Sequence, residues 1–182
     1  LGKPTDALEA YRKGHSYYRA LELAKAANPD AVVSIEREWA DYLVSQGQND
    51  AATMHYVESG DFSLALNCSL RAQQWNQAAE ILRSASSTAS LRDELKVQYL
   101  RVGRHFASIG DTETAEDLFL CVDAVKELIE MYLNLGRVDE AMRRAKRQMK
   151  PQEIDQTFIE TAKKLEKKPT TRQTAEKIYI AI

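Results

Sequence analysis

Small apolar residues recur along this chain at a fixed distance from residues that are suited to ending a helix. In nine places a glycine or polar residue is followed five positions later by an alanine or leucine, and four positions after that usually by an aromatic or small residue. This spacing is typical of short helices joined by tight turns. The nine copies are Gly2/Ala7/Tyr11, His15/Ala20/Ala24, Gly47/Ala52/Tyr56, Gly60/Ala65/Ser69, Gln74/Ala79/Arg83, Gly110/Ala115/Phe119, Asp123/Leu128/Tyr132, Gly136/Ala141/Ala145 and Thr170/Ala175/Tyr179.

Each position of the pattern has a physical role. The first residue ends one helix in the left-handed conformation, which glycine adopts without steric cost. The alanine lets a neighbouring helix approach closely, and the residue four positions later lies on the same face, where a ring can fill the groove. The pattern therefore predicts the second-helix core of a tetratricopeptide-like unit.

The distances between the copies indicate repetition. Most alanine-type positions are 13 or 14 residues apart, which is one helix plus one turn, and the wider gaps of 32 to 36 are close to one tetratricopeptide repeat of about 34 residues. Positions 52, 65 and 79 reappear 62 or 63 residues later at 115, 128 and 141. We therefore expect an all-α, tetratricopeptide-like α-solenoid of about 12 antiparallel helices, with a duplicated multi-helix block and no strand.

The turn and capping signals give approximate helix boundaries. In the expected helix 30–46 we place Val33, Glu36, Trp39, Ala40 and Leu43 on the inward face. The serine-rich stretch 84–90 is the expected loop and break in packing, after which a helix capped by Ser90 and Asp93 begins. The expected helices cover about 5–13, 17–27, 30–46, 50–59, 62–72, 75–84, 91–109, 111–120, 123–135, 138–149, 151–167 and 171 onwards.

Composition is compatible with one solenoid segment spanning 1–182. The 182 residues are 44% hydrophobic with a net charge of −2, and no apolar stretch approaches the length of a membrane span. We expect Cys68 and Cys121 to be buried free thiols of a soluble, intracellular protein. Both ends look as if they were cut from a longer protein.

No pattern of catalytic or ligand-binding residues is found. His15, His55 and His105 lie 40 and 50 positions apart, without a second metal ligand at helical spacing, and we expect them to be partly exposed near helix ends. Glycine-rich phosphate loops are absent. Carboxylate pairs such as Glu113/Asp117 belong to solvated helix faces. We predict no catalytic residue, no cofactor, no metal and no small-molecule substrate.

Charge is distributed unevenly, because residues 137–177 carry twelve Lys or Arg against seven Asp or Glu. Arg143, Arg147 and Lys150 are spaced at i, i+4 and i+7 on one expected helix, with Arg144 and Lys146 beside them. This cluster has two interpretations: a solubilising face near a helix C-terminus, or a contact for an acidic partner segment or an anionic membrane surface. Further lysines on the next helix are Lys163, Lys164, Lys167 and Lys168.

Several segments resemble one known family. They are Trp39-Ala-Asp-Tyr-Leu-Val-Ser-Gln-Gly-Gln, Ala51-Ala-Thr-Met-His-Tyr, Ala72-Gln-Gln-Trp-Asn-Gln-Ala-Ala, Val102-Gly-Arg-His-Phe-Ala-Ser and Ala115-Glu-Asp-Leu-Phe, with shorter matches at Ala10-Tyr-Arg-Lys, Met131-Tyr and Gly136-Arg. They are similar to the family of the largest subunit of intraflagellar transport complex B, although Gln73 replaces its usual arginine.

The resemblance implies an internal piece of a long helical solenoid that follows two β-propellers in the full protein. It implies a scaffold of the trains that run in the cilium or flagellum, found also at the basal body and in the cytoplasm, with other intraflagellar transport subunits as partners. The alternatives are a scaffold of another coat-like trafficking complex, or a helical-repeat nucleic-acid binder. The first 136 residues carry a net charge of −7, which disfavours the nucleic-acid binder because it would repel phosphates. We therefore expect no nucleic-acid partner.

Overall fold

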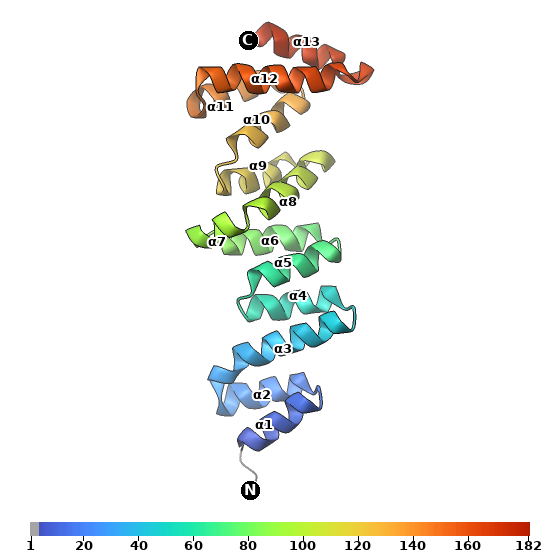
Figure 1. Ribbon diagram of the computed structural model, residues 1–182, viewed down its shortest axis with the longest axis vertical. Coiled ribbons are helices and arrows are strands. Elements are labelled where there is room, and N and C mark those ends of the chain that lie inside the picture. The colour runs from blue at the N-terminus through green and yellow to red at the C-terminus, as the bar shows by residue number, and fades with distance from the viewer. Residues whose placement is uncertain (1–3) are drawn as a thin grey trace. The chain divides into compact units, whose positions relative to one another are not determined.

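The computed structural model describes residues 4–182, which contain α-helices, two short 3-10 helices and no strand (Figure 1). The predicted all-α, tetratricopeptide-like class is confirmed, with thirteen α-helices in this range in place of about twelve. The chain divides into two compact units, one through Thr88 (unit 1) and one from Ala89 onwards (unit 2). The first residue of the Gly2/Ala7/Tyr11 copy lies outside the described residues.

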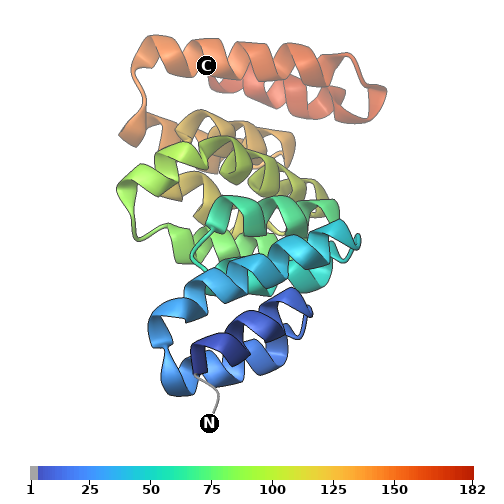
Figure 2. The same cartoon turned by 60° about the horizontal axis from the view of Figure 1, so that its bottom comes forward.

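Unit 1 is a succession of antiparallel hairpins in which each helix packs against the next (Figures 1 and 2). The contact of α3 with α4 is the most extensive in this unit. Its elements are α1 (Pro4–Lys13), α2 (Tyr17–Ala27), the 3-10 helix η1 (Pro29–Ala31), α3 (Val32–Ser45), α4 (Asn49–Glu58), α5 (Phe62–Arg71) and α6 (Trp75–Ala85).

Unit 2 continues the same design and ends with a long helix, α12, and a shorter one, α13, that lie antiparallel in both views (Figures 1 and 2). Its elements are α7 (Ala89–Glu94), α8 (Lys96–Ile109), α9 (Thr112–Cys121), α10 (Val125–Asn134), α11 (Val138–Gln148), α12 (Pro151–Glu166), the 3-10 helix η2 (Pro169–Thr171) and α13 (Arg172–Ala181).

The turns between helices have the left-handed residue that the pattern predicts. Gly47 has φ 76° and Gly110 has φ 87°, and the amide after each donates back across the turn, from Gln48 to the Leu43 carbonyl at 2.9 Å and from Asp111 to the Phe106 carbonyl at 3.0 Å. These bonds satisfy carbonyls at the end of the preceding helix. The other left-handed residues among those described are His15, Gly60, Gln73, Asp123 and Gly136.

The predicted copy Gln74/Ala79/Arg83 is one residue too late in the sequence. The left-handed residue is Gln73, with φ 57°, and not Gln74, whose amide donates to the Ser69 carbonyl at 2.8 Å. Ala78 and Leu82 are therefore the buried members of this copy, while Arg83 is half-buried. Because Ala78 and Ala79 are adjacent and both buried, their spacing alone could not distinguish the two registers.

The corrected register makes the internal repeat regular. The small or apolar positions at 52, 65 and 78 are fully buried, and those at 115, 128 and 141, each 63 residues later, are fully buried as well. The helix triplet α4–α6 of unit 1 thus has its counterpart in α9–α11 of unit 2. The alanines bring neighbouring helices together, and the leucine at 128 fills the equivalent space with its own side chain.

The two terminal copies differ from the prediction. Ala7 is exposed, and its neighbour Leu8 packs into the cluster formed with α2 and α3. Thr170 lies inside η2, without a left-handed conformation, although Ala175 is buried as expected. Pro169 explains the difference at Thr170, because it starts a 3-10 turn that joins α12 to α13 without a left-handed residue.

Two long predicted helices are each divided. Pro29 opens η1 before α3 begins, and within α3 Ile35 is fully buried whereas Val33 is 54% exposed. The expected inward position of Val33 is therefore wrong, while Glu36, Ala40 and Leu43 are buried and Trp39 is half-buried. Val33 and Ile35 are two residues apart and point in directions about 200° apart around the helix, so only one of them can face inward.

The predicted helix 91–109 bends at Leu95, which separates α7 from α8 and is itself buried. Residue 90 lies inside α7, so the expected cap formed by Ser90 and Asp93 is wrong. The serine-rich connection is also shorter than expected, because α6 extends through Ala85 and α7 starts at Ala89. Leu95 is therefore a core residue at the point where the two helices meet.

Neither Cys68 nor Cys121 forms a disulfide within the described residues. Cys68 is buried, which raises the pKa of its thiol, and Cys121 is half-buried rather than buried. No helix in the described range has the length and apolar character needed to cross a bilayer.

The stability of the chain is expected to fall above pH 10. Burial raises the pKa of Tyr99 to about 12, and burial followed by the hydrogen bond to Asp41 raises the pKa of Tyr56. In the unfolded chain both phenols ionise near pH 10. The stabilisation that the neutral phenols contribute is therefore complete below pH 10 and is lost as the pH rises toward 12.

Thermal unfolding followed by circular dichroism between about pH 9 and pH 11.5 tests this expectation. The Tyr99→Phe variant should show a smaller decrease in melting temperature over this range than the unmodified chain. A variant that loses as much stability as the unmodified chain contradicts the role of Tyr99.

Candidate protein-binding surfaces

The predicted basic cluster is centred on α11, where Arg143, Lys146 and Arg147 are exposed. Arg143 and Arg147 line an open surface hollow of about 380 Å³ together with Glu140, Arg144 and Gln148. The Arg143 side chain donates to the carbonyl oxygen of Asp139 at 3.3 Å. Within residues 4–182, neither Lys146 nor Arg147 has a carboxylate partner.

Arg144 differs from its neighbours because it is half-buried and paired with residues of other helices. Its guanidinium forms an ion pair with Glu116 of α9 and lies 5.3 Å from the ring centroid of Tyr132. Arg137 lies over the same ring at 4.7 Å and binds Glu140, with Nε to Oε1 at 2.8 Å. These contacts tie α9, α10 and α11 together.

The same network sets the ionisation of its members. Burial, followed by the hydrogen bond that its hydroxyl donates to Glu116, raises the pKa of Tyr132. The hydrogen bonds from Arg137 lower the pKa of Glu140. Each of the two carboxylates has a guanidinium partner, Arg144 for Glu116 and Arg137 for Glu140, and neither forms an ion pair with Arg143 or Arg147.

Lys150 does not belong to α11. The predicted stripe of Arg143, Arg147 and Lys150 on one helix is therefore wrong for Lys150. The helix ends at Gln148, Met149 is extended, and Lys150 precedes α12, where its backbone amide donates to Glu153 at 3.2 Å. Pro151 explains the break, since a residue before proline is driven away from the helical conformation.

The four lysines at the end of α12 and beyond it are exposed. The Lys164 ammonium lies 3.6 Å from the Glu130 carboxylate of α10, so it belongs to the α10–α12 contact. Lys126 and Glu160 join the same two helices at 3.1 Å. The exposed part of α11, defined by Arg143, Lys146 and Arg147, is called here the α11 basic face.

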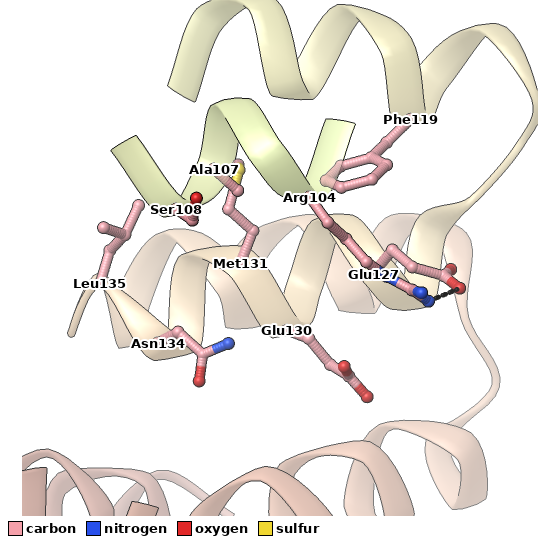
Figure 3. A pocket seen from close by; sticks show the side chains of 9 residues that line it. All are labelled: Arg104, Ala107, Ser108, Phe119, Glu127, Glu130, Met131, Asn134 and Leu135. Atoms are coloured by element: carbon pink, nitrogen blue, oxygen red, sulfur yellow. Dashed lines mark hydrogen bonds and ion pairs between the residues drawn. The ribbon is translucent and has the colours of Figure 1, made fainter. Parts of the chain in front are cut away.

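A second concave feature, which the sequence did not reveal, lies between α8 and α10 (Figure 3). This groove of about 310 Å³ has the buried side chains of Phe119 and Met131 in its lining. Arg104 and Glu127 form an ion pair across it at 3.4 Å. Its remaining lining residues are Ala107, Ser108, Glu130, Asn134 and Leu135.

Gly103 of α8 decides where the Phe119 ring lies. A Cβ atom at this position would be 2.6 Å from Cε1 of Phe119, which means that the ring packs directly on the α8 backbone. The counterpart of Gly103 in unit 1, 63 residues earlier, is Ala40, and the counterpart of Phe119 is Tyr56, whose hydroxyl donates to Asp41 at 2.6 Å. This hydrogen bond has no equivalent at Phe119, which lacks a hydroxyl.

The histidines serve packing in the described structure. His55 is hydrogen-bonded to the buried Glu36 at 2.7 Å and stacks on Trp39 with ring centroids 4.0 Å apart. His15 stacks on Tyr42 at 4.4 Å. Across residues 4–182, no three His, Cys, Asp or Glu side chains converge in a way that could hold a metal ion.

Comparison with known proteins gives a consistent result, although no family model matches the chain. The intraflagellar transport protein 172 homolog of Homo sapiens is 37% identical over all 182 residues. Intraflagellar transport protein 172 of Chlamydomonas reinhardtii is 30% identical over 181 residues, and intraflagellar transport protein osm-1 of Caenorhabditis elegans is 31% identical over 179.

The chain is similar along its whole length to the intraflagellar transport 172 proteins. It spans 10% of the length of these relatives, so it corresponds to one segment of the family's proteins. The human and Chlamydomonas matches cover the whole chain, including α11 and the α8–α10 groove. The resemblance to the largest subunit of intraflagellar transport complex B is thereby confirmed at the level of the family.

Proposed function

We propose that this chain is a structural scaffold segment of an intraflagellar transport train subunit, in which it mediates protein–protein interactions during cilium or flagellum assembly and intraciliary transport. The observation that carries the proposal is similarity along the whole chain to proteins that are named for intraflagellar transport in animals and an alga. The fold supports it, because helical repeats expose an extended surface suited to binding other proteins.

The proposal includes the place and the partners of the protein. It works in the cilium or flagellum, at the basal body and in the cytoplasm, and its partners are other intraflagellar transport subunits. Each of its two compact units is a segment of helical repeats, and the chain spans 10% of the length of its relatives. Its role is architectural, without catalysis, because its polar clusters link helices to one another, as Arg144 and Glu116 do.

Replacement of the matching segment in the Chlamydomonas protein tests the proposal. Cells that lack intraflagellar transport protein 172 would receive this protein with its matching 181 residues exchanged for the present chain. We expect flagella to regrow and the tagged protein to co-purify with other intraflagellar transport subunits.

The control replaces the same segment with an unrelated consensus tetratricopeptide array of equal length, which keeps the helical spacer but not its surface. If the consensus array restores flagella as well as this chain does, the specific protein–protein role is wrong. If the present chain restores neither flagella nor co-purification, the assignment to transport trains is wrong.

A further inference from the structure

We propose that the α11 basic face is a docking site for an acidic, helical segment of a partner protein, with Arg143 and Arg147 binding its carboxylates. This inference rests on the proposed scaffold function and names the chemistry of one partner. It follows from three features of α11: its uncompensated cations, the difference from its counterpart in unit 1, and the spacing of the two arginines.

The first feature is the charge balance around the hollow. Arg144 forms an ion pair with Glu116, and Arg137 forms one with Glu140, whereas within the described range Arg143 and Arg147 form no ion pair of their own. Both line the hollow, as does Glu140, whose carboxylate is bound by Arg137. A ligand that brings carboxylates here gains two charge-assisted hydrogen-bond partners without breaking an existing ion pair.

The second feature is that the fold does not need these cations. α6 has the same place in unit 1 that α11 has in unit 2, since Ala78 and Ala141 are both fully buried, 63 residues apart. At the positions of Arg143 and Arg147, α6 has Glu80 and Ser84. The counterpart of Lys146 is Arg83, which pairs with Glu80 at 2.6 Å. A helix in this position thus buries the same alanine with a nearly neutral exterior.

The third feature is geometric. Arg143 and Arg147 are four residues apart and therefore lie one turn apart on the same helix face, about 6 Å from each other. Two carboxylates at the same spacing on a partner helix can face them in register. The planar guanidinium binds a carboxylate through two parallel hydrogen bonds, which favours Arg-to-carboxylate recognition.

A protein segment fits this surface better than a membrane does. Peripheral membrane helices combine cations with large apolar side chains that enter the lipid. Among the residues that the structure describes, no large exposed apolar side chain lies on α11. The carboxylates of Glu116 and Glu140 also interrupt the positive field that an extended anionic surface would meet.

A binding experiment with a defined probe tests the proposal. The probe is a fluorescent, alanine-based helical peptide with glutamates paired at i and i+4, and its control has glutamine at the same positions. The 182-residue chain is compared with R143Q/R147Q and with K163Q/K167Q, which removes two exposed lysine charges from α12. Circular dichroism establishes that each variant is folded.

We expect the glutamate peptide to bind in a salt-dependent way and the glutamine peptide to bind at least about tenfold more weakly. R143Q/R147Q should weaken binding of the glutamate peptide by at least about tenfold, and K163Q/K167Q by less than about twofold. Equal losses in the two variants would mean that only net charge matters, which overturns the site. Absence of binding by the unmodified chain overturns it as well.

A parallel measurement uses phosphatidylcholine vesicles with and without phosphatidylserine. The unmodified chain could bind the anionic vesicles but not the peptide, and R143Q/R147Q could abolish this vesicle binding. That result would mean that the α11 basic face binds a membrane and not a protein. A chain that restores flagella but does not bind the peptide overturns this inference and leaves the scaffold function standing. A chain that binds the peptide but fails to restore flagella contradicts the scaffold function instead.

Discussion

Replacement of Phe119 by alanine is expected to lower the free energy of unfolding by about 3–5 kcal/mol. The Phe119 ring is 1% exposed, lies against the backbone of α8 at Gly103 and lines the α8–α10 groove with Met131. Its removal leaves a cavity at the point where α8, α9 and α10 meet, and neighbouring helices that are fixed by their turns can close it only in part.

Urea denaturation followed by circular dichroism measures this loss. The matched control is Leu120→Ala, because Leu120 is adjacent in sequence but 40% exposed, and it should change stability by less than about 1 kcal/mol. Trp39 and Trp75 both belong to unit 1, so their fluorescence in the same samples reports whether the effect extends beyond unit 2. A loss below about 1 kcal/mol for Phe119→Ala would show that the ring is not part of the core.

Substitution of Gly103 by alanine is expected to destabilise the chain by about 1–3 kcal/mol, although glycine-to-alanine changes inside helices usually stabilise by about 1 kcal/mol. The sign is reversed because the new methyl group would lie 2.6 Å from Cε1 and 3.0 Å from Cδ1 of Phe119. The ring is enclosed and cannot move into solvent, so that α8 and α9 must separate slightly.

A double substitution provides the control for this prediction. Phe119→Leu shortens the side chain that the new methyl group meets, so Gly103→Ala should cost less in the Phe119→Leu background than alone. Chemical denaturation of the two single variants and the double variant gives the coupling energy. If Gly103→Ala alone increases stability, the Phe119 ring does not pack closely on the α8 backbone.

The helical fold could be predicted because its turns depend on local sequence. Gly47, Gly60, Gly110 and Gly136 are left-handed where the spacing placed them, and so are His15 and Asp123. The pattern failed where two neighbouring residues could fill one role, as at Gln73 and Gln74. It also failed at Leu95, where the chain divides into α7 and α8 although the sequence is compatible with a continuous helix.

The candidate surface was only partly predictable, for reasons that differ between residues. The end of α11 before Lys150 could have been inferred from Pro151. The loss of Arg144 to an internal contact could not, because its partner Glu116 is 28 positions away and belongs to another helix. The α8–α10 groove depends on how Phe119 packs on Gly103, and no motif in the sequence signals that contact.

In the 63-residue repeat, the buried residues that determine the fold are distinct from the exposed residues that could contact a partner. Because α6 and α11 share a buried alanine but differ in their outward charges, the outer residues of one helix could be transplanted onto the other without altering a buried position. A lineage that carries two such blocks can therefore change its associations through one copy while the other stays as it was.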